Sequence, residues 1–164
     1  MEKNEVMSGV RFALHLLNNE VRELIHQGGG EVSPLEVVNL LKKEDEPDYL
    51  PCSAERLHQF FDGLILKRRG PLEGEAPKIN TKHIDNNVIL RKIRIAFALK
   101  DVDVIELLKK TGFAVTKSEL GAMARKKDHP HYMKCGDQLI RYLLKGMVMT
   151  YRPEGLKSIN TLSQ

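Results

Sequence analysis

The chain contains the same sequence unit twice, and this duplication constrains its fold more than any other feature. Residues 4–69 align without a gap with residues 87–152. The clearest stretch reads Lys42-Lys-Glu-Asp-Glu-Pro-Asp-Tyr-Leu-Pro-Cys52 and returns as Arg125-Lys-Lys-Asp-His-Pro-His-Tyr-Met-Lys-Cys135. Function must therefore be sought in one unit and in the differences between its two copies.

Apolar residues recur at helical spacing in four short stretches of each unit, and no alternating strand pattern of useful length occurs. We therefore predict an all-α fold, a tandem duplication of a four-short-helix unit. Because four helices of about ten residues form a very small core, the two units should pack together with pseudo-twofold symmetry. The predicted organisation is helical repeat 1 (4–69), a linker (70–85), helical repeat 2 (87–152) and a flexible tail (153–164).

Polar residues predict where several helices begin and end. Two sites have a hydroxyl followed three residues later by a carboxylate, which is the capping-box pattern: Ser33 with Glu36, and Thr116 with Glu119. The other predicted N-caps are Asn18, Asp101 and Ser53. We expect Gly29 and Gly112 to end the second helix of each unit, and Leu17 to lie on the apolar face of the first helix.

Composition bounds the class of protein. Hydrophobic residues make up 41% and charged residues 29% of the chain, which is typical of a globular protein. No apolar run approaches the ~20 residues needed to cross a bilayer, and the N-terminal sequence lacks a signal-peptide core. The two cysteines occupy equivalent positions, which favours matching structural roles over a mutual disulfide. We predict a cytoplasmic protein.

Charge is divided unequally between the units. Residues 4–69 carry eight Lys and Arg against eleven Asp and Glu, a formal charge of −3. Residues 87–152 carry fourteen against six, a formal charge of +8. This contrast indicates a polyanionic partner for the second unit, and the alternative is a solvated basic surface.

Two polar residues recur on the first and second helices of each unit. They are Arg11 and Glu23 in the first, and Arg94 and Glu106 in the second. We predict two structural pairs, because a planar guanidinium matches the two oxygens of a carboxylate. The alternative is a polar site duplicated on each unit.

The repeated loop is predicted to be structural. Its aspartate should cap a turn, its proline should stiffen the turn, and its tyrosine and cysteine should enter the core; these residues are Asp45, Pro47, Tyr49 and Cys52, and Asp128, Pro130, Tyr132 and Cys135. Weaker alternatives are a metal site at His129, His131 and Cys135, or a thiolate–histidine pair. We predict no catalytic residue, no metal, no cofactor and no enzymatic activity.

The layout of helix two, the Gly112 turn and helix three resembles a helix-turn-helix. In the second unit, helix three is predicted over residues 117–127, ending in three basic residues. The predicted nucleic-acid contacts are Arg91, Lys92, Lys109, Lys110, Lys117, Arg125, Lys126, Lys127, Lys134, Arg141, Lys145 and Arg152.

Several stretches resemble the YehS-like family of short, duplicated bacterial cytosolic proteins. The stretches are Asn87-Asn-Val-Ile-Leu-Arg-Lys-Ile-Arg-Ile-Ala96, Leu40-Leu-Lys-Lys-Glu-Asp45, Lys126-Lys-Asp-His-Pro-His-Tyr-Met-Lys-Cys-Gly-Asp-Gln138 and Leu144-Lys-Gly146. The family is classed as a domain of unknown function, so the resemblance implies helical repeats and a bacterial cytosolic protein but no catalytic or ligand residues.

The resulting hypothesis is a non-enzymatic helical-repeat protein whose basic second repeat contacts DNA or RNA. The alternative is a protein–protein interaction or assembly module that uses an apolar groove between the repeats. The sequence predicts no membrane partner and leaves the oligomeric state open.

Overall fold

The computed structural model describes residues 1–71, 73 and 80–152, and this part of the chain contains eight helices and no strand. The first unit comprises α1 (Lys3–Ala13), α2 (Asn18–Gln27), α3 (Pro34–Leu40) and α4 (Ala54–Arg69). The second comprises α5 (Asn86–Phe97), α6 (Asp101–Lys109), α7 (Lys117–Met123) and α8 (Asp137–Tyr151). The all-α prediction, with four helices in each unit, is confirmed.

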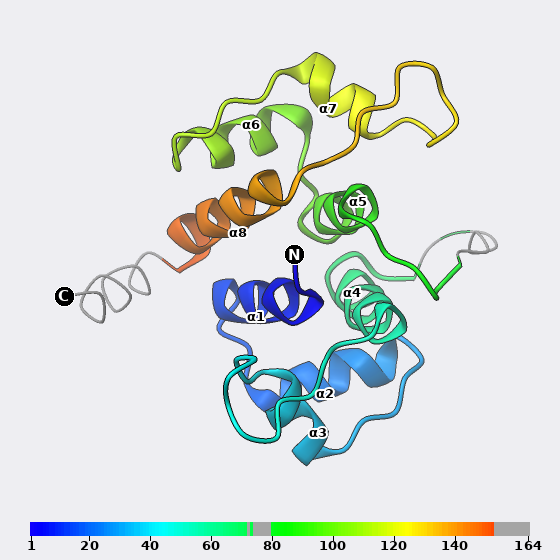
Figure 1. Cartoon of the computed structure of the whole chain (residues 1–164), viewed down its shortest axis with the longest axis vertical. Coiled ribbons are helices and arrows are strands. Elements are labelled where there is room, and N and C mark those ends of the chain that lie inside the picture. Colours follow the sequence, from blue (N-terminus) through cyan, green and yellow to red (C-terminus); the bar gives the residue numbers. More distant parts are fainter. Residues whose placement is uncertain (72, 74–79, 153–164) are drawn as a thin grey trace.

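The two units are related by an approximate twofold axis. In Figure 1 this axis runs along the line of sight, so that a half-turn in the plane of the picture exchanges the units. Helices α1, α4, α5 and α8 form the centre of the molecule, with α2 and α3 at one end and α6 and α7 at the other (Figure 1). The first helix of each unit makes its largest contact with the fourth helix of the other unit, α1 with α8 and α5 with α4. The units therefore share one core.

That core contains the apolar faces predicted for α2, α4, α6 and α8. Phe60, Phe61 and Leu57 of α4 are fully buried, as are Ile140 and Leu143 of α8. Within each unit the fourth helix crosses the second at a glycine, Gly63 or Gly146. A Cβ at either glycine would overlap the backbone carbonyl of Leu24 or Leu107. This close approach explains why a glycine recurs at the same point in both units.

Most of the predicted helix ends are confirmed. Both capping boxes form, with Glu36 N donating to Ser33 Oγ at 3.1 Å and Glu119 N donating to Thr116 Oγ1 at 3.0 Å. Ser53 accepts from Arg56 N at 3.1 Å and caps α4. Gly29 and Gly112 follow the second helices with φ of 94° and 79°, in the left-handed region that favours glycine.

The start of the second helix was predicted one residue too late. Asn18 and Asp101 are the first helical residues, and Leu17 and Lys100 take the N-cap positions. The side chains of Glu20 and Asp103 accept hydrogen bonds from the N–H groups of those two residues, at 2.6 and 2.8 Å. Leu17 therefore lies outside the first helix, and it is 64% exposed rather than part of the core.

The predicted Arg94–Glu106 pair is also corrected. Arg94 Nη2 lies 2.7 Å from Asp101 Oδ1, and Arg94 Nε donates to the Leu99 carbonyl at 3.2 Å. Asp101 faces the end of α5 from the first turn of α6, whereas Glu106 lies further along α6 and is exposed. In the first unit Glu23 is exposed and accepts from Gln27 instead. Arg11 Nε is buried without a hydrogen-bond partner among the described residues, and Asn18 stands where the second unit has Asp101.

Parts of two predicted segments lie outside the described residues. These are residues 72 and 74–79 of the linker and residues 153–164 of the predicted tail. The described end of the linker contacts the core, since the His83 carbonyl accepts from Nε2 of buried His58 at 2.8 Å. Within the described residues, every helix is too short or too polar to cross a membrane.

Candidate nucleic-acid interface

The α3–α4 loop (residues 41–53) and the α7–α8 loop (residues 124–136) have closely matching backbones. In the first, Tyr49 N donates to Glu46 O at 3.3 Å and Leu50 N donates to Asn39 O at 3.1 Å. The second repeats both bonds at equivalent positions, from Tyr132 to His129 at 3.0 Å and from Met133 to Ala122 at 3.1 Å. The two loops therefore share these backbone hydrogen bonds with different side chains, and they differ at one turn position, where Asp48 has a φ of 65° and its counterpart His131 does not have a positive φ.

A buried asparagine fixes each loop to the first helix of its unit. Asn87 on α5 is 5% exposed. Its Nδ2 donates to the carbonyls of Met123 and Met133 at 2.9 and 2.8 Å, and its Oδ1 accepts from Cys135 N at 2.9 Å. Asn4 makes the same three bonds in the first unit and also accepts from Tyr49 Oη at 2.8 Å.

Asn4 and Asn87 occupy equivalent positions in the two units, and the sequence alone assigned them no role. A signal was present, since a polar residue recurs at the same position inside an otherwise apolar helix face. Because a buried amide must satisfy its donors and acceptors, such a residue indicates buried backbone groups nearby. The asparagine thus positions the loop.

The structural interpretation of the loop is largely confirmed, with one correction. Cys52 and Cys135 are 7% and 0% exposed, and the tyrosines are half-buried. The predicted turn caps, Asp45 and Asp128, are exposed. Residues one position later serve instead: Glu46 Oε1 accepts from Lys43 N at 3.1 Å, and His129 Nδ1 accepts from His131 N at 3.0 Å.

The cysteine is poorly suited to nucleophilic chemistry. Burial raises the pKa of the Cys135 thiol to about 12, so the thiol stays protonated at neutral pH, whereas only the thiolate is a good nucleophile. We expect iodoacetamide at pH 7.5 to alkylate native Cys135 at least ~1000-fold more slowly than the denaturant-unfolded chain. Mass spectrometry over time measures this, and labelling of Cys135 at the unfolded rate would contradict its placement in the core.

The histidines do not join the cysteine. His129 and His131 are exposed in the α7–α8 loop, with ring centroids 5.8 Å apart, while Cys135 is enclosed by the core. Within the described residues, no three side chains of His, Cys, Asp or Glu are grouped to hold a metal ion. The geometry of the described residues does not support the alternative of a metal site at these three residues.

The two loops differ in charge where their backbones agree. Residues 42–51 carry two lysines and four carboxylates, a formal charge of −2. Residues 125–134 carry four basic residues and one carboxylate, a formal charge of +3 before either histidine is protonated. Because most backbone hydrogen bonds of the loop form with either charge, the additional positive charge of the second loop is not needed for them. Arg125 does have a structural contact, since its Nη1 donates to the His131 carbonyl at 3.0 Å, as Lys42 Nζ donates to the Pro47 carbonyl at 2.8 Å in the first loop.

The basic residues do not belong to a recognition helix. Helix α7 ends at Met123 after seven residues, so Arg125, Lys126 and Lys127 lie in the loop instead of at the end of a helix over 117–127. Lys117 is the only basic residue within α7. The helix-turn-helix layout of α6 and α7 is present, but the positive charge is displaced from it.

Three of the predicted nucleic-acid contacts tie the two units together. Lys92 is 5% exposed and its Nζ lies 2.6 Å from Asp62 of α4. Arg141 pairs with Glu5 of α1 at 3.1 Å. Arg152 donates to the Phe12 carbonyl at 3.1 Å and its guanidinium lies 4.1 Å from the centre of the Phe12 ring. These three residues help to hold the fold.

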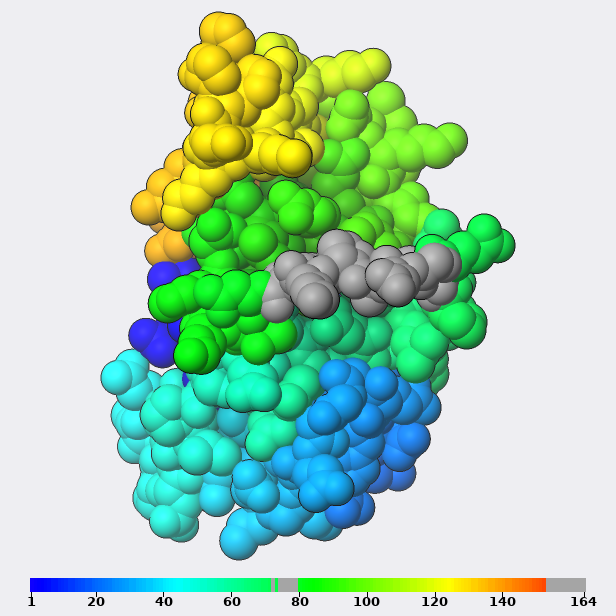
Figure 2. Space-filling view, turned by 90° about the vertical axis from the view of Figure 1, so that its right-hand side faces the viewer, coloured from blue at the N-terminus to red at the C-terminus, as the bar shows by residue number. Residues whose placement is uncertain are grey.

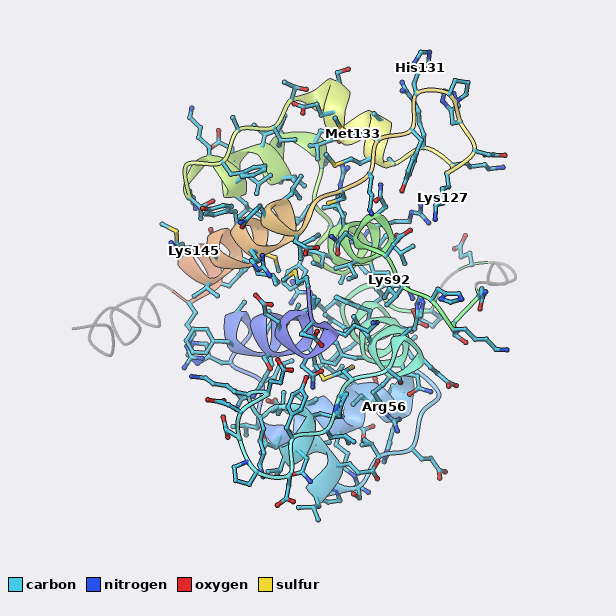
Figure 3. All side chains as sticks on the ribbon, viewed as in Figure 1. Arg56, Lys92, Lys127, His131, Met133 and Lys145 are labelled. Carbon is cyan, nitrogen blue, oxygen red and sulfur yellow. The ribbon has the colours of Figure 1, made fainter. Side chains whose placement is uncertain are left out.

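Five other candidates lie together on one side of the second unit, and we call them the loop cluster: Arg91, Arg125, Lys126, Lys127 and Lys134. All five are exposed. Figure 2 shows the α7–α8 loop (yellow) directly above α5 (green), which carries Arg91. In Figure 3, Lys127 lies on the side of the loop that faces α5, and His131 lies at its tip.

The remaining candidates lie elsewhere. Lys145 of α8 is on the opposite side of the view from Lys127 and His131 (Figure 3). Lys110 donates to Thr150 Oγ1 at 2.8 Å at the end of α6, next to exposed Lys109, and Lys117 begins α7. The structure thus divides the twelve predicted contacts into the loop cluster, ties between units and separate surface charges.

A pocket of about 250 Å³ opens between α5 and α7 beside the loop cluster. Arg91 and Arg94 contribute charge to its lining, and Leu99, Leu120 and Met123 contribute apolar surface. Ala124 also lines the pocket, and it directly precedes Arg125 of the loop cluster. A basic loop and a partly apolar pocket therefore adjoin.

Comparison with known proteins places this arrangement in a family. The family model described as "Protein of unknown function (DUF1456)" matches the chain twice, at residues 3–70 and 86–153. The "Uncharacterized protein YehS" of Escherichia coli (strain K12) is 35% identical over 147 residues, covering 90% of this chain and 94% of that protein. No solved structure matches the chain significantly. The chain therefore belongs to the DUF1456 family and contains that family's helical unit twice.

Proposed function

We propose that the protein binds nucleic acid through the loop cluster of its second unit. The observation that carries the proposal is the charge difference between two loops with closely matching backbones. A −2 loop and a +3 loop are joined to the same scaffold by equivalent asparagine hydrogen bonds. Arg125 and Lys126 have basic counterparts in Lys42 and Lys43. The lysines that distinguish the second loop are Lys127 and Lys134, which stand where the first loop has Glu44 and Pro51, and they remain for a partner with negative charge.

The chemistry of the loop cluster suits phosphate. Its three lysines are exposed ammonium groups, which act as point charges toward phosphate oxygens, and its arginines offer planar forks of donors. Arg125 uses one Nη to donate to the His131 carbonyl at 3.0 Å, so its guanidinium is braced against the loop with other donors remaining. A braced donor loses less conformational entropy when it binds.

Salt dependence tests the proposal. We expect a fluorescein-labelled single-stranded DNA of twenty nucleotides to bind with an affinity that falls steeply with salt, because each phosphate contact releases a counterion. Five contacts predict a slope of log K against log salt of roughly −3.5, from about 0.7 per contact on single strands. Fluorescence anisotropy between ~20 mM and ~200 mM salt measures this slope.

Two outcomes of that titration would contradict the proposal. One is no binding at the lowest salt. The other is a mass that increases with protein concentration at low salt without DNA, together with weak DNA binding. That result would assign the basic loop to pairing with the acidic α3–α4 loop of a second copy, since the two loops lie at opposite ends of the molecule (Figure 1). Sedimentation equilibrium over the same salt range measures the mass.

A further inference from the structure

We propose that the pocket between α5 and α7 takes one unstacked base of a single-stranded nucleic acid. The inference rests on the proposed function, because phosphate contacts at the loop cluster would bring the strand to the pocket. It goes further by naming a single strand as the partner and by assigning a site to the base itself.

The size and lining of the pocket suit one planar ring system. Its volume of about 250 Å³ is below the ~300 Å³ at which pockets for drug-sized molecules begin. Leu99, Leu120 and Met123 supply apolar walls. A base in a duplex is stacked on both faces and paired along one edge. Only an unpaired, unstacked base could therefore enter the pocket.

The two arginines give the pocket polar contacts for a base. Arg94 is held in place by Asp101 at 2.7 Å and by the Leu99 carbonyl at 3.2 Å. These contacts use Nη2 and Nε, and Nη1 has no hydrogen-bond partner within the described part of the chain, so it can donate to an acceptor on a base edge. Arg91 is exposed and has no hydrogen-bond partner among the described residues, and its guanidinium plane can stack on a base or meet a phosphate.

Comparison of the two units shows which side chains leave this space open. Ala124, Ile95 and Arg91 line the pocket in the second unit. The equivalent positions in the first unit carry Leu41, Phe12 and Ser8. The ring of Phe12 is moreover covered by the guanidinium of Arg152 at 4.1 Å. The first unit thus has two bulkier side chains, one fewer arginine and an acidic loop at the same place.

The position of the pocket links it to the loop cluster. Arg91 belongs to both, and Ala124 on the pocket wall is followed directly by Arg125. Lys127 lies on the side of the loop facing α5 (Figure 3). A strand whose phosphates contact the loop would therefore pass the mouth of the pocket, and one base could turn inward.

The test compares a fluorescein-labelled oligothymidine of twelve nucleotides with an abasic strand of the same length and charge. Both should bind, and the strand with bases should bind about tenfold more tightly, as expected for one well-placed base. Ala124→Leu introduces the first unit's side chain at an exposed position, and it should remove this preference while leaving the affinity for the abasic strand unchanged. Ile95→Phe, also exposed, should act in the same direction.

The outcomes separate this inference from the proposed function. Absence of binding to either strand would contradict the proposed function. Equal binding of both strands, or a tenfold preference that survives both Ala124→Leu and Ile95→Phe, would overturn the base site and leave phosphate binding intact. Displacement of the oligothymidine by poly-glutamate as readily as by unlabelled oligothymidine would also overturn it. Thermal unfolding of each variant checks that the fold is retained.

Discussion

Replacing Asn87 with alanine should lower the free energy of unfolding by about 3 kcal/mol. The change removes three hydrogen bonds and leaves Cys135 N and the carbonyls of Met123 and Met133 without this partner. A buried polar group that loses its partner costs roughly 1–3 kcal/mol. Because native proteins are stable by only about 5–15 kcal/mol, the effect should be large. Urea denaturation followed by circular dichroism measures it.

A matched control isolates the role of the buried amide. Asn19 is exposed near the start of α2, so Asn19→Ala should change stability by less than about 0.5 kcal/mol. Asn4→Ala should behave like Asn87→Ala, since Asn4 makes the equivalent bonds in the first unit. A loss below about 1 kcal/mol in both Asn4→Ala and Asn87→Ala would show that these bonds do not hold the loops.

The duplication allowed much of the fold to be predicted from the sequence. Apolar positions in phase at Phe60, Phe61, Ile140 and Leu143 indicated the fourth helices, and all four side chains are fully buried. Capping boxes at Ser33 and Thr116 indicated the third helices correctly. These signals are local, because a helix face and a cap each depend on residues within one or two turns.

The predictions that failed depended on contacts between elements. Arg94 could be assigned to α5 from the sequence, but its partner depended on how α6 leaves α5, which brings Asp101 instead of Glu106 to the guanidinium. The sequence could not show that Lys92 is buried. Its position depends on the packing of α5 against α4 of the other unit, which places Lys92 next to Asp62. Residues 124–127 follow a helical pattern, but the chain leaves α7 after Met123 and Met133 N donates to Ala122 O. Tertiary contacts decided each of these cases.

The sequence indicated that the second unit carries the basic residues, but it did not indicate which of them lie together on one surface. Net charge pointed to the unit that carries the loop cluster, but it could not separate residues that contact the other unit from residues that stay at the surface. Arg141 and Arg152 contribute to the +8 of the second unit and are engaged with Glu5 and Phe12 of the first. Charge counted along a sequence therefore overstates the charge available to a partner.

Removing the three lysines of the loop cluster should weaken binding to single-stranded DNA by at least about 30-fold at ~50 mM salt. The variant is Lys126→Ala/Lys127→Ala/Lys134→Ala. Three exposed contacts worth about 0.7 kcal/mol each account for this minimum. The salt slope should also become shallower by about 2, because three fewer counterions are released. All three lysines are exposed, so we expect stability to change little.

A second triple variant separates position from charge. Lys109, Lys117 and Lys145 are exposed lysines away from the loop cluster. Lys109→Ala/Lys117→Ala/Lys145→Ala removes the same formal charge and should lower affinity by less than about threefold, because the three lysines belong to α6, α7 and α8 and not to the loop that contacts phosphate. A diffuse electrostatic attraction would affect both variants equally.

A side-by-side anisotropy titration of the two triple variants tests whether the basic loop, and not the second unit's charge in general, binds nucleic acid. Both variants are titrated with the same labelled single-stranded DNA at ~50 mM salt. We expect at least a tenfold difference in affinity, with the loop variant binding more weakly. Equal affinities for the two variants would contradict it and would leave the positive charge of the second unit as a general property of its surface.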